Sequence, residues 1–165
     1  MKSCLHSTLV NDPFGDPGLL VQFLFQKRSL LFDLGDISPL SNAELLKVSH
    51  VFVSHTHIDH FIGFDRLLRT VFGREKTITF FGPENFIKNV EGKLTGFTWN
   101  LVDRYEESLT FKVVEVREGR LLKASFRAID KFKRVDEEEV ELNNGIILDD
   151  PLFTVSAAVL EHRVP

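Results

Sequence analysis

Three histidines and an aspartate crowd into the short segment Ser54-His55-Thr56-His57-Ile58-Asp59-His60 of a chain with only six histidines. His55 and His57 are two residues apart at the end of an expected strand, whose alternation projects both imidazoles to one side. Asp59 and His60 follow where the chain leaves the extended state, so both can turn toward a second ion nearby. Neutral imidazoles and carboxylates are ligands for zinc, manganese or iron. The segment therefore predicts a hydrolytic site with two metal ions, zinc being the default.

The chemistry expected of such a site is metal-assisted hydrolysis. Two neighbouring ions lower the pKa of a bridging water, polarise a phosphoryl oxygen and stabilise the leaving oxygen. Asp59 is the candidate catalytic residue, both as a ligand and as the group that orients the nucleophile or relays its proton. One histidine alone is more often a structural polar residue, so the prediction depends on the whole cluster.

Strand and helix patterns alternate around the cluster and must position it. The segment that follows it carries an apolar stripe at helical spacing, which includes Phe61, Phe64 and Leu68, and Ser41 with Glu44 forms a capping-box pattern. An acidic run at 136–139 indicates a solvated loop or strand edge. We expect an α+β fold in which helices cover one face of a sheet and leave the other face without a partner. The expected strands are 19–26, 29–33, 51–54, 77–81, 110–118, 120–126 and 152–160, and the expected helices are 41–47, 60–72 and 84–94.

The cluster also resembles a known signature. His55-Thr56-His57-Ile58-Asp59-His60 followed by Gly63 is similar to the H-x-H-x-D-H-x-x-G motif of the metallo-β-lactamase superfamily. The flanking Ser54 and Phe61-Ile62-Gly63-Phe64 are most similar to its ribonuclease Z branch, the tRNA 3′-processing endonucleases. Asp33 resembles the aspartate of the first motif of that superfamily, and His162 resembles its third metal-binding histidine.

This resemblance implies an αββα sandwich, of which residues 1–165 supply about one half, as a domain incomplete at its C-terminus. His55, His57 and His162 would hold one ion, Asp59 and His60 would hold the other, and Asp33 would orient the ligands from behind. The bridging aspartate and final histidine of the family have no counterpart in the sequence. We therefore expect the isolated chain to bind metal poorly and hydrolyse little, and to associate with a complementary half or with a second copy of itself.

The function implied is that of a phosphodiesterase or endoribonuclease of ribonuclease Z type, which cuts precursor tRNA through a metal-bound hydroxide. Two alternatives stay open. One is a small-molecule hydrolase, either a thioesterase like glyoxalase II or a cyclic-nucleotide phosphodiesterase. The other is a non-catalytic subunit that binds metal or a partner.

Composition limits the partners and the cellular location that this chemistry can have. The formal charge of −4 argues against wholesale electrostatic capture of nucleic acid, but Arg66, Arg69, Arg74 and Lys76 form a basic stretch that either meets RNA phosphates or is a solvated helix face. Cys4 is the only cysteine, which excludes an internal disulfide. No apolar run is long enough to span a membrane and nothing marks the chain for export, so we expect a cytoplasmic location.

Overall fold

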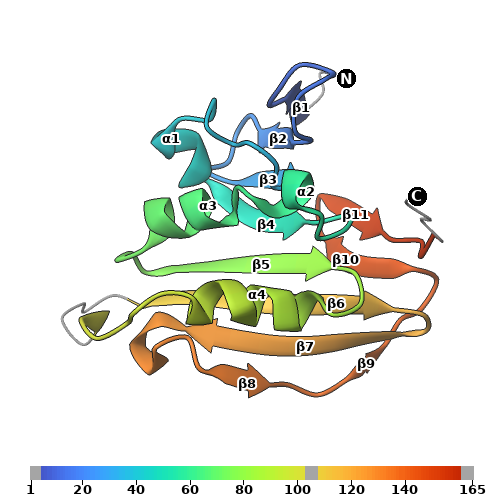
Figure 1. The fold of residues 1–165 in the computed structure, drawn as a ribbon. Coiled ribbons are helices and arrows are strands. Elements are labelled where there is room, and N and C mark those ends of the chain that lie inside the picture. The colour runs from blue at the N-terminus through green and yellow to red at the C-terminus, as the bar shows by residue number, and fades with distance from the viewer. Residues whose placement is uncertain (1–4, 103–107, 161–165) are drawn as a thin grey trace.

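The computed structural model describes residues 5–102 and 108–160 and confirms the α+β class (Figure 1). The strands are β1 (Leu5–Leu9), β2 (Leu19–Phe23), β3 (Ser29–Phe32), β4 (Val48–Phe52), β5 (Lys76–Gly82), β6 (Leu109–Arg117), β7 (Arg120–Arg127), β8 (Arg134–Asp136), β9 (Val140–Glu141), β10 (Ile146–Asp150) and β11 (Phe153–Ser156). The helices are α1 (Asn42–Leu45), α2 (Ile58–Phe61), α3 (Phe64–Val71) and α4 (Phe86–Thr95), with a short 3₁₀ turn at Ala128–Asp130. None of the helices in these described ranges combines the length and the apolar character needed to cross a bilayer.

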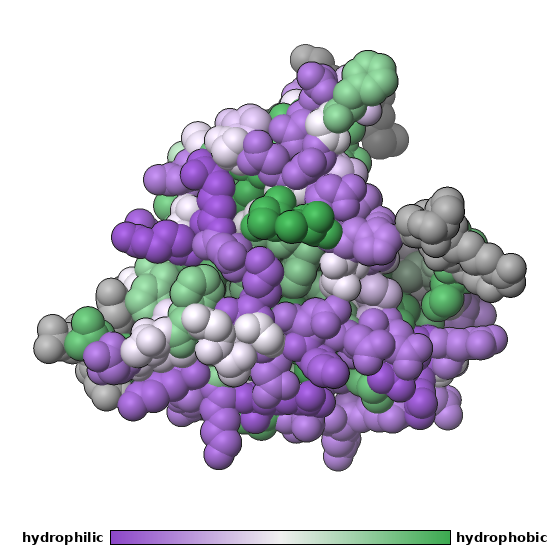
Figure 2. Space-filling view, viewed as in Figure 1, coloured by the Kyte–Doolittle hydropathy of each residue, from purple (hydrophilic) through white to green (hydrophobic). Residues whose placement is uncertain are grey.

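One mixed sheet organises the molecule. Within the described residues nine strands join in the order β1 to β8, with β9 paired to β7. Strands β3, β4, β5 and β6 are parallel neighbours, whereas the pairs toward both edges are antiparallel. Parallel neighbours bring their carboxyl ends to one edge of the sheet, so the residues that follow β3 and β4 meet there. The helices lie over one face, and that side of the molecule is largely hydrophilic (Figures 1 and 2).

The helix predicted at 60–72 is instead two helices, α2 and α3, separated at Ile62 and Gly63. A long-range contact causes the break. The Gly63 amide donates to the Leu34 carbonyl oxygen at 2.8 Å, and a Cβ atom on Gly63 would collide with the carbonyl oxygen of Gly35. The loop after β3 therefore packs directly on the backbone at the start of α3. The capping box of Ser41 and Glu44 is present at α1, as predicted.

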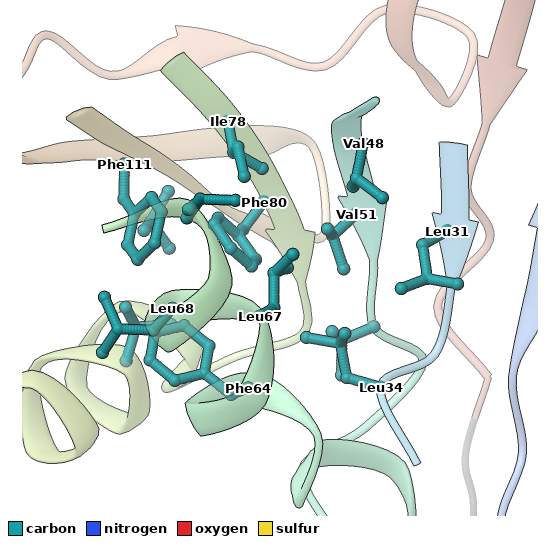
Figure 3. Packing of buried hydrophobic residues seen from close by; sticks show 14 of the residues in the cluster. Leu31, Leu34, Val48, Val51, Phe64, Leu67, Leu68, Ile78, Phe80 and Phe111 are labelled. Atoms are coloured by element: carbon teal, nitrogen blue, oxygen red, sulfur yellow. The ribbon is translucent and has the colours of Figure 1, made fainter. Parts of the chain in front are cut away.

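Phenylalanine rings fill the space between the helices and the sheet. Phe64 on α3, Phe80 on β5 and Phe111 on β6 are each 0% exposed. Their ring centroids are 4.9 to 5.8 Å apart, and Figure 3 shows them packed beside Leu67 and Leu68. The predicted apolar stripe is thus the core-facing side of α3.

The opposite face of the sheet is not left bare, which corrects the expectation of an unpartnered face. The hairpin of β10 and β11 lies on it and starts a second layer. Arg28 anchors the hairpin through an ion pair with Asp150 at 2.9 Å and lies over the rings of Phe23 and Phe153. The buried sheet residues beneath are Phe23, Leu30, Phe52, Phe81, Val114, Val116 and Leu121. The strand predicted at 152–160 ends at Ser156, and its partner β10 was not predicted.

His50 of β4 lies on this second face, between Phe52 and Phe81, with ring centroids 6.5 and 6.4 Å away. Burial lowers the pKa of His50, the charge of Arg28 lowers it further, and Asp150 partly opposes the shift. The unfolded chain takes up a proton at this position near pH 6.5 while the folded chain resists it. His50 therefore subtracts stability as the pH falls below about 6.5.

When the pH is lowered from about 7 to about 5, the free energy of unfolding should fall less in His50→Gln than in the wild type. Urea denaturation at the two pH values measures the difference. His6→Gln is the control, because His6 is exposed in β1. Equal losses in the wild type and His50→Gln would remove His50 as the cause.

All three residues of β8 are exposed, and so are residues 137–139 after it. The acidic run is therefore a solvated strand edge, as predicted. Strands β1, β8 and β9 had no strong sequence pattern and were not predicted.

Candidate metal centre

The site is built where β3 and β4 end side by side. Asp33 follows β3 with a φ of 59°, and Ser54 follows β4 two residues after its end. The Ser54 amide donates to Asp33 Oδ1 at 2.8 Å, and the Ser54 hydroxyl donates to the same oxygen at 2.9 Å. The left-handed backbone at Asp33 thus directs a carboxylate across the gap between the two strand ends.

The three histidine rings of the cluster lie against one another. The centroid of His55 is 4.4 Å from that of His57 and 3.9 Å from that of His60. The predicted proximity of His55 and His57 holds, but its reason differs, because β4 ends at Phe52 and both histidines are in the loop that follows. His57 is the N-cap of α2, and His60 is on that helix.

Two of these rings have polar partners at Nδ1. Nδ1 of His60 lies 3.0 Å from Asp33 Oδ2, and Nδ1 of His55 lies 3.0 Å from Ser54 Oγ. Ser54 Oγ also lies 3.2 Å from Nδ1 of His60, and which atom donates in the two Ser54–histidine contacts depends on the tautomer of each ring. With its proton on Nδ1, His60 would keep the lone pair on Nε2, the arrangement in which a carboxylate behind a histidine orients it toward a cation.

Asp59 is the carboxylate on the solvent side of the cluster. Its Oδ2 lies 3.6 Å from Nε2 of His60, and its side chain is 51% exposed against 17% for His60. The side chains of these adjacent residues lie close to each other, and their convergence on a second ion stays a prediction. A substrate from solvent can reach this carboxylate directly.

Two contacts that hold the loop were missed from the sequence. Asn89 on α4 donates its Nδ2 to Thr56 Oγ1 at 2.8 Å, between the two histidines of the loop. The Leu34 amide donates to the carbonyl oxygen of His60 at 2.9 Å. Neither residue carries a local signal, since each acts on a segment more than twenty residues away.

Histidine and aspartate side chains are suitable ligands for a divalent cation, but in this structure those of the cluster do not surround a common point. Within 5–102 and 108–160, no three His, Cys, Asp or Glu side chains are arranged as a finished metal site. Among the described residues, Asp33 and Asp59 both form their ion pairs with His60, and no lysine or arginine takes part. His162, the third ligand expected for the first ion, lies outside the described residues.

Comparisons with known proteins agree with the signature. No protein-family model matches the chain. Ribonuclease Z of Deinococcus radiodurans is 28% identical over 141 residues, which cover 82% of this chain and 41% of the relative. Ribonuclease Z of Methanocaldococcus jannaschii is 34% identical over 80 residues, covering 45% of this chain and 25% of the relative.

This chain is similar in sequence to ribonuclease Z along most of its length. The resemblance to ribonuclease Z inferred from the motifs is thereby confirmed. Among solved structures, human tRNase Z, short form, superposes with a TM-score of 0.39 and 16% identity over 71% of this chain and 55% of that one. The chain spans less than half the length of the two curated relatives described above.

Proposed function

We propose that this chain carries part of the active site of a metal-dependent phosphodiesterase of ribonuclease Z type, which acts on the 3′ end of precursor tRNA. The observation that carries the proposal is the network from Asp33 through Ser54 to the rings of His55 and His60. A structural cluster of polar residues does not need a carboxylate behind His60 and an exposed carboxylate in front of it. The similarity to ribonuclease Z sequences supports the same assignment.

His55 and His57 would hold one ion together with His162, and Asp59 and His60 would hold the other. Zinc, or manganese or iron in its place, would supply the Lewis acidity that makes water nucleophilic at neutral pH and polarises a phosphoryl oxygen. The remaining ligands of the second ion would come from a complementary half or from a second copy of the chain.

The residues of this chain have separate tasks in that reaction. Asp33 and Ser54 fix the tautomer and the direction of the imidazoles, so no reorganisation is needed when charge develops. The Asp59 carboxylate is exposed at 51% and can hold the proton of the attacking water at its Oδ2. Asn89 keeps Thr56, and with it the loop, in place.

The test is a comparison of three substrates with the full-length natural protein loaded with zinc: precursor tRNA with a 3′ trailer, bis-p-nitrophenyl phosphate and S-lactoylglutathione. We expect hydrolysis of the two phosphodiesters and no hydrolysis of the thioester. His6→Ala is a matched control because His6 lies in β1. Hydrolysis of the thioester alone would favour a small-molecule hydrolase, and bound metal without any hydrolysis would favour a non-catalytic subunit.

A further inference from the structure

An open hollow of about 620 Å³ lies between α1 and α3, away from the histidines. It is lined by Asn42, Arg66, Arg69, Thr70 and Arg74. In Figure 1 the end of α3 and the connection to β5 lie at the left of the molecule, whereas α2 lies near the carboxyl ends of the strands. In Figure 2 hydrophilic side chains gather at the upper left, and pale green side chains lie below them. The hollow is thus a second polar region, distinct from the candidate metal centre.

Arg66 is built into the wall of the hollow. Its Nε donates to the Ile37 carbonyl oxygen at 3.2 Å, and its Nη2 donates to the Leu40 carbonyl oxygen at 2.9 Å. These bonds to neutral acceptors hold the guanidinium in place without cancelling its charge. The charge of Arg66 is therefore preorganised, because little side-chain entropy remains to be lost on binding.

Arg69 and Arg74 are not held by comparable hydrogen bonds. Both are exposed, and in the part of the chain that the structure describes neither forms an ion pair or a side-chain hydrogen bond. Arg69 lies three residues after Arg66, so the two share one face of α3. Three guanidinium groups therefore surround the same open volume.

Most acidic residues of this region have other polar partners. Asp65 pairs with Lys93 at 3.1 Å, and Glu44 is held by Ser41 in the capping box. Asp36 accepts from the amide and the hydroxyl of Ser38, and these bonds lower its pKa. Glu75, next to Arg74 in the chain, is the other acid of this region. The lining itself contains three arginines and no carboxylate.

The shape and lining select the class of ligand. Sites for small molecules are concave and mostly apolar, whereas this hollow is open and lined by arginine. Guanidinium groups match phosphate oxygens in geometry as well as in charge. We propose that the hollow binds the phosphodiester backbone of the RNA substrate at a distance from the cleaved bond, an inference that rests on the proposed function.

The spacing suits one continuous strand. Arg66 and Arg69 lie about one turn apart on α3, so their guanidinium groups can contact neighbouring phosphates of one strand. The arginines would set the position of the substrate without taking part in bond cleavage.

The test measures RNA binding without turnover. Fluorescence anisotropy of a fluorescein-labelled precursor tRNA, in EDTA and over a range of KCl concentrations, gives the Kd and its salt dependence. We expect Arg69→Gln/Arg74→Gln to weaken binding about tenfold and to lower the salt slope by about two. Lys131→Gln/Lys133→Gln removes the same charge from an exposed site elsewhere and should change the Kd less than about twofold. Arg69→Lys/Arg74→Lys keeps the charge, so it should keep the salt slope but recover only part of the affinity.

The contrary results are equally specific. An unchanged Kd and slope in the arginine variant, or an equal loss in the lysine control, would overturn the proposal. Inorganic phosphate that displaces the RNA far better than KCl of equal ionic strength would assign the hollow to a free anion instead. Thermal unfolding of each variant establishes that it is folded. Because the assay needs no metal and no hydrolysis, its outcome is independent of whether the protein proves to be a nuclease.

Discussion

Replacing His57 with alanine should leave the full-length protein almost without bound zinc. The His57 ring lies 4.4 Å from that of His55, and loss of one of two neighbouring imidazoles removes a direct ligand of the proposed first ion. Loss of residues that merely support ligands already costs ~10-fold to ~100-fold in metal affinity, so we expect at least about 100-fold here. His57 makes no side-chain capping bond to α2, so the variant should keep the helix.

Asp59→Ala separates the two roles of the cluster. It should keep metal at the position of His55 and His57 but lower turnover by about 10²-fold to 10⁴-fold, because the proton acceptor is gone. Elemental analysis of the purified variants, with His6→Ala alongside, measures occupancy, and hydrolysis of bis-p-nitrophenyl phosphate measures turnover. Unchanged zinc content in His57→Ala would defeat the ligand assignment, whatever the activity.

Phe64→Ala should lower the free energy of unfolding by ~3–5 kcal/mol, because it opens a cavity in the middle of the core. Phe64 is 0% exposed, and its ring meets those of Phe61 and Phe80 at 5.3 and 5.6 Å. Phe14→Ala is the matched control, since Phe14 is 100% exposed and should cost nearly nothing. Urea denaturation followed by circular dichroism compares the two. A loss below about 1 kcal/mol for Phe64→Ala would mean that the core closes around the gap.

The elements predicted well are those with local causes. The hairpin of β6 and β7 turns at Gly119, whose φ of 70° suits glycine, and its alternation places Phe111 and Val113 inside. The capping box of Ser41 and Glu44 needs only residues within one turn of helix. Such signals lie within a few residues of one another, so the sequence displays them directly.

The elements missed depend on distant partners. The break before α3 follows from the approach of Gly63 to Leu34, which no pattern in the segment reveals. Strand β10 ends in Asp149 and Asp150, a poor strand pattern, but Asp150 is held by Arg28 more than a hundred residues earlier. Long-range ion pairs and backbone contacts of this kind override local propensity.

Prediction of the candidate site had the same limits. The density of histidine between residues 55 and 60 was visible at once, and the structure brings three of those rings together. Asp33 came only through the resemblance, because a lone aspartate after a strand has no pattern of its own. The support from Asn89 had no signal at all, since it depends on how α4 packs.

The acidic edge of the sheet has a consequence for how the protein behaves at high concentration. An unpaired strand offers free backbone groups to any other chain, and fibre growth starts from such pairing. Here Asp136 pairs with Arg134 and Glu139 pairs with Arg120, while residues 137 and 138 are exposed acids beside the edge strand. Charged side chains of this kind discourage two copies from pairing edge to edge at β8.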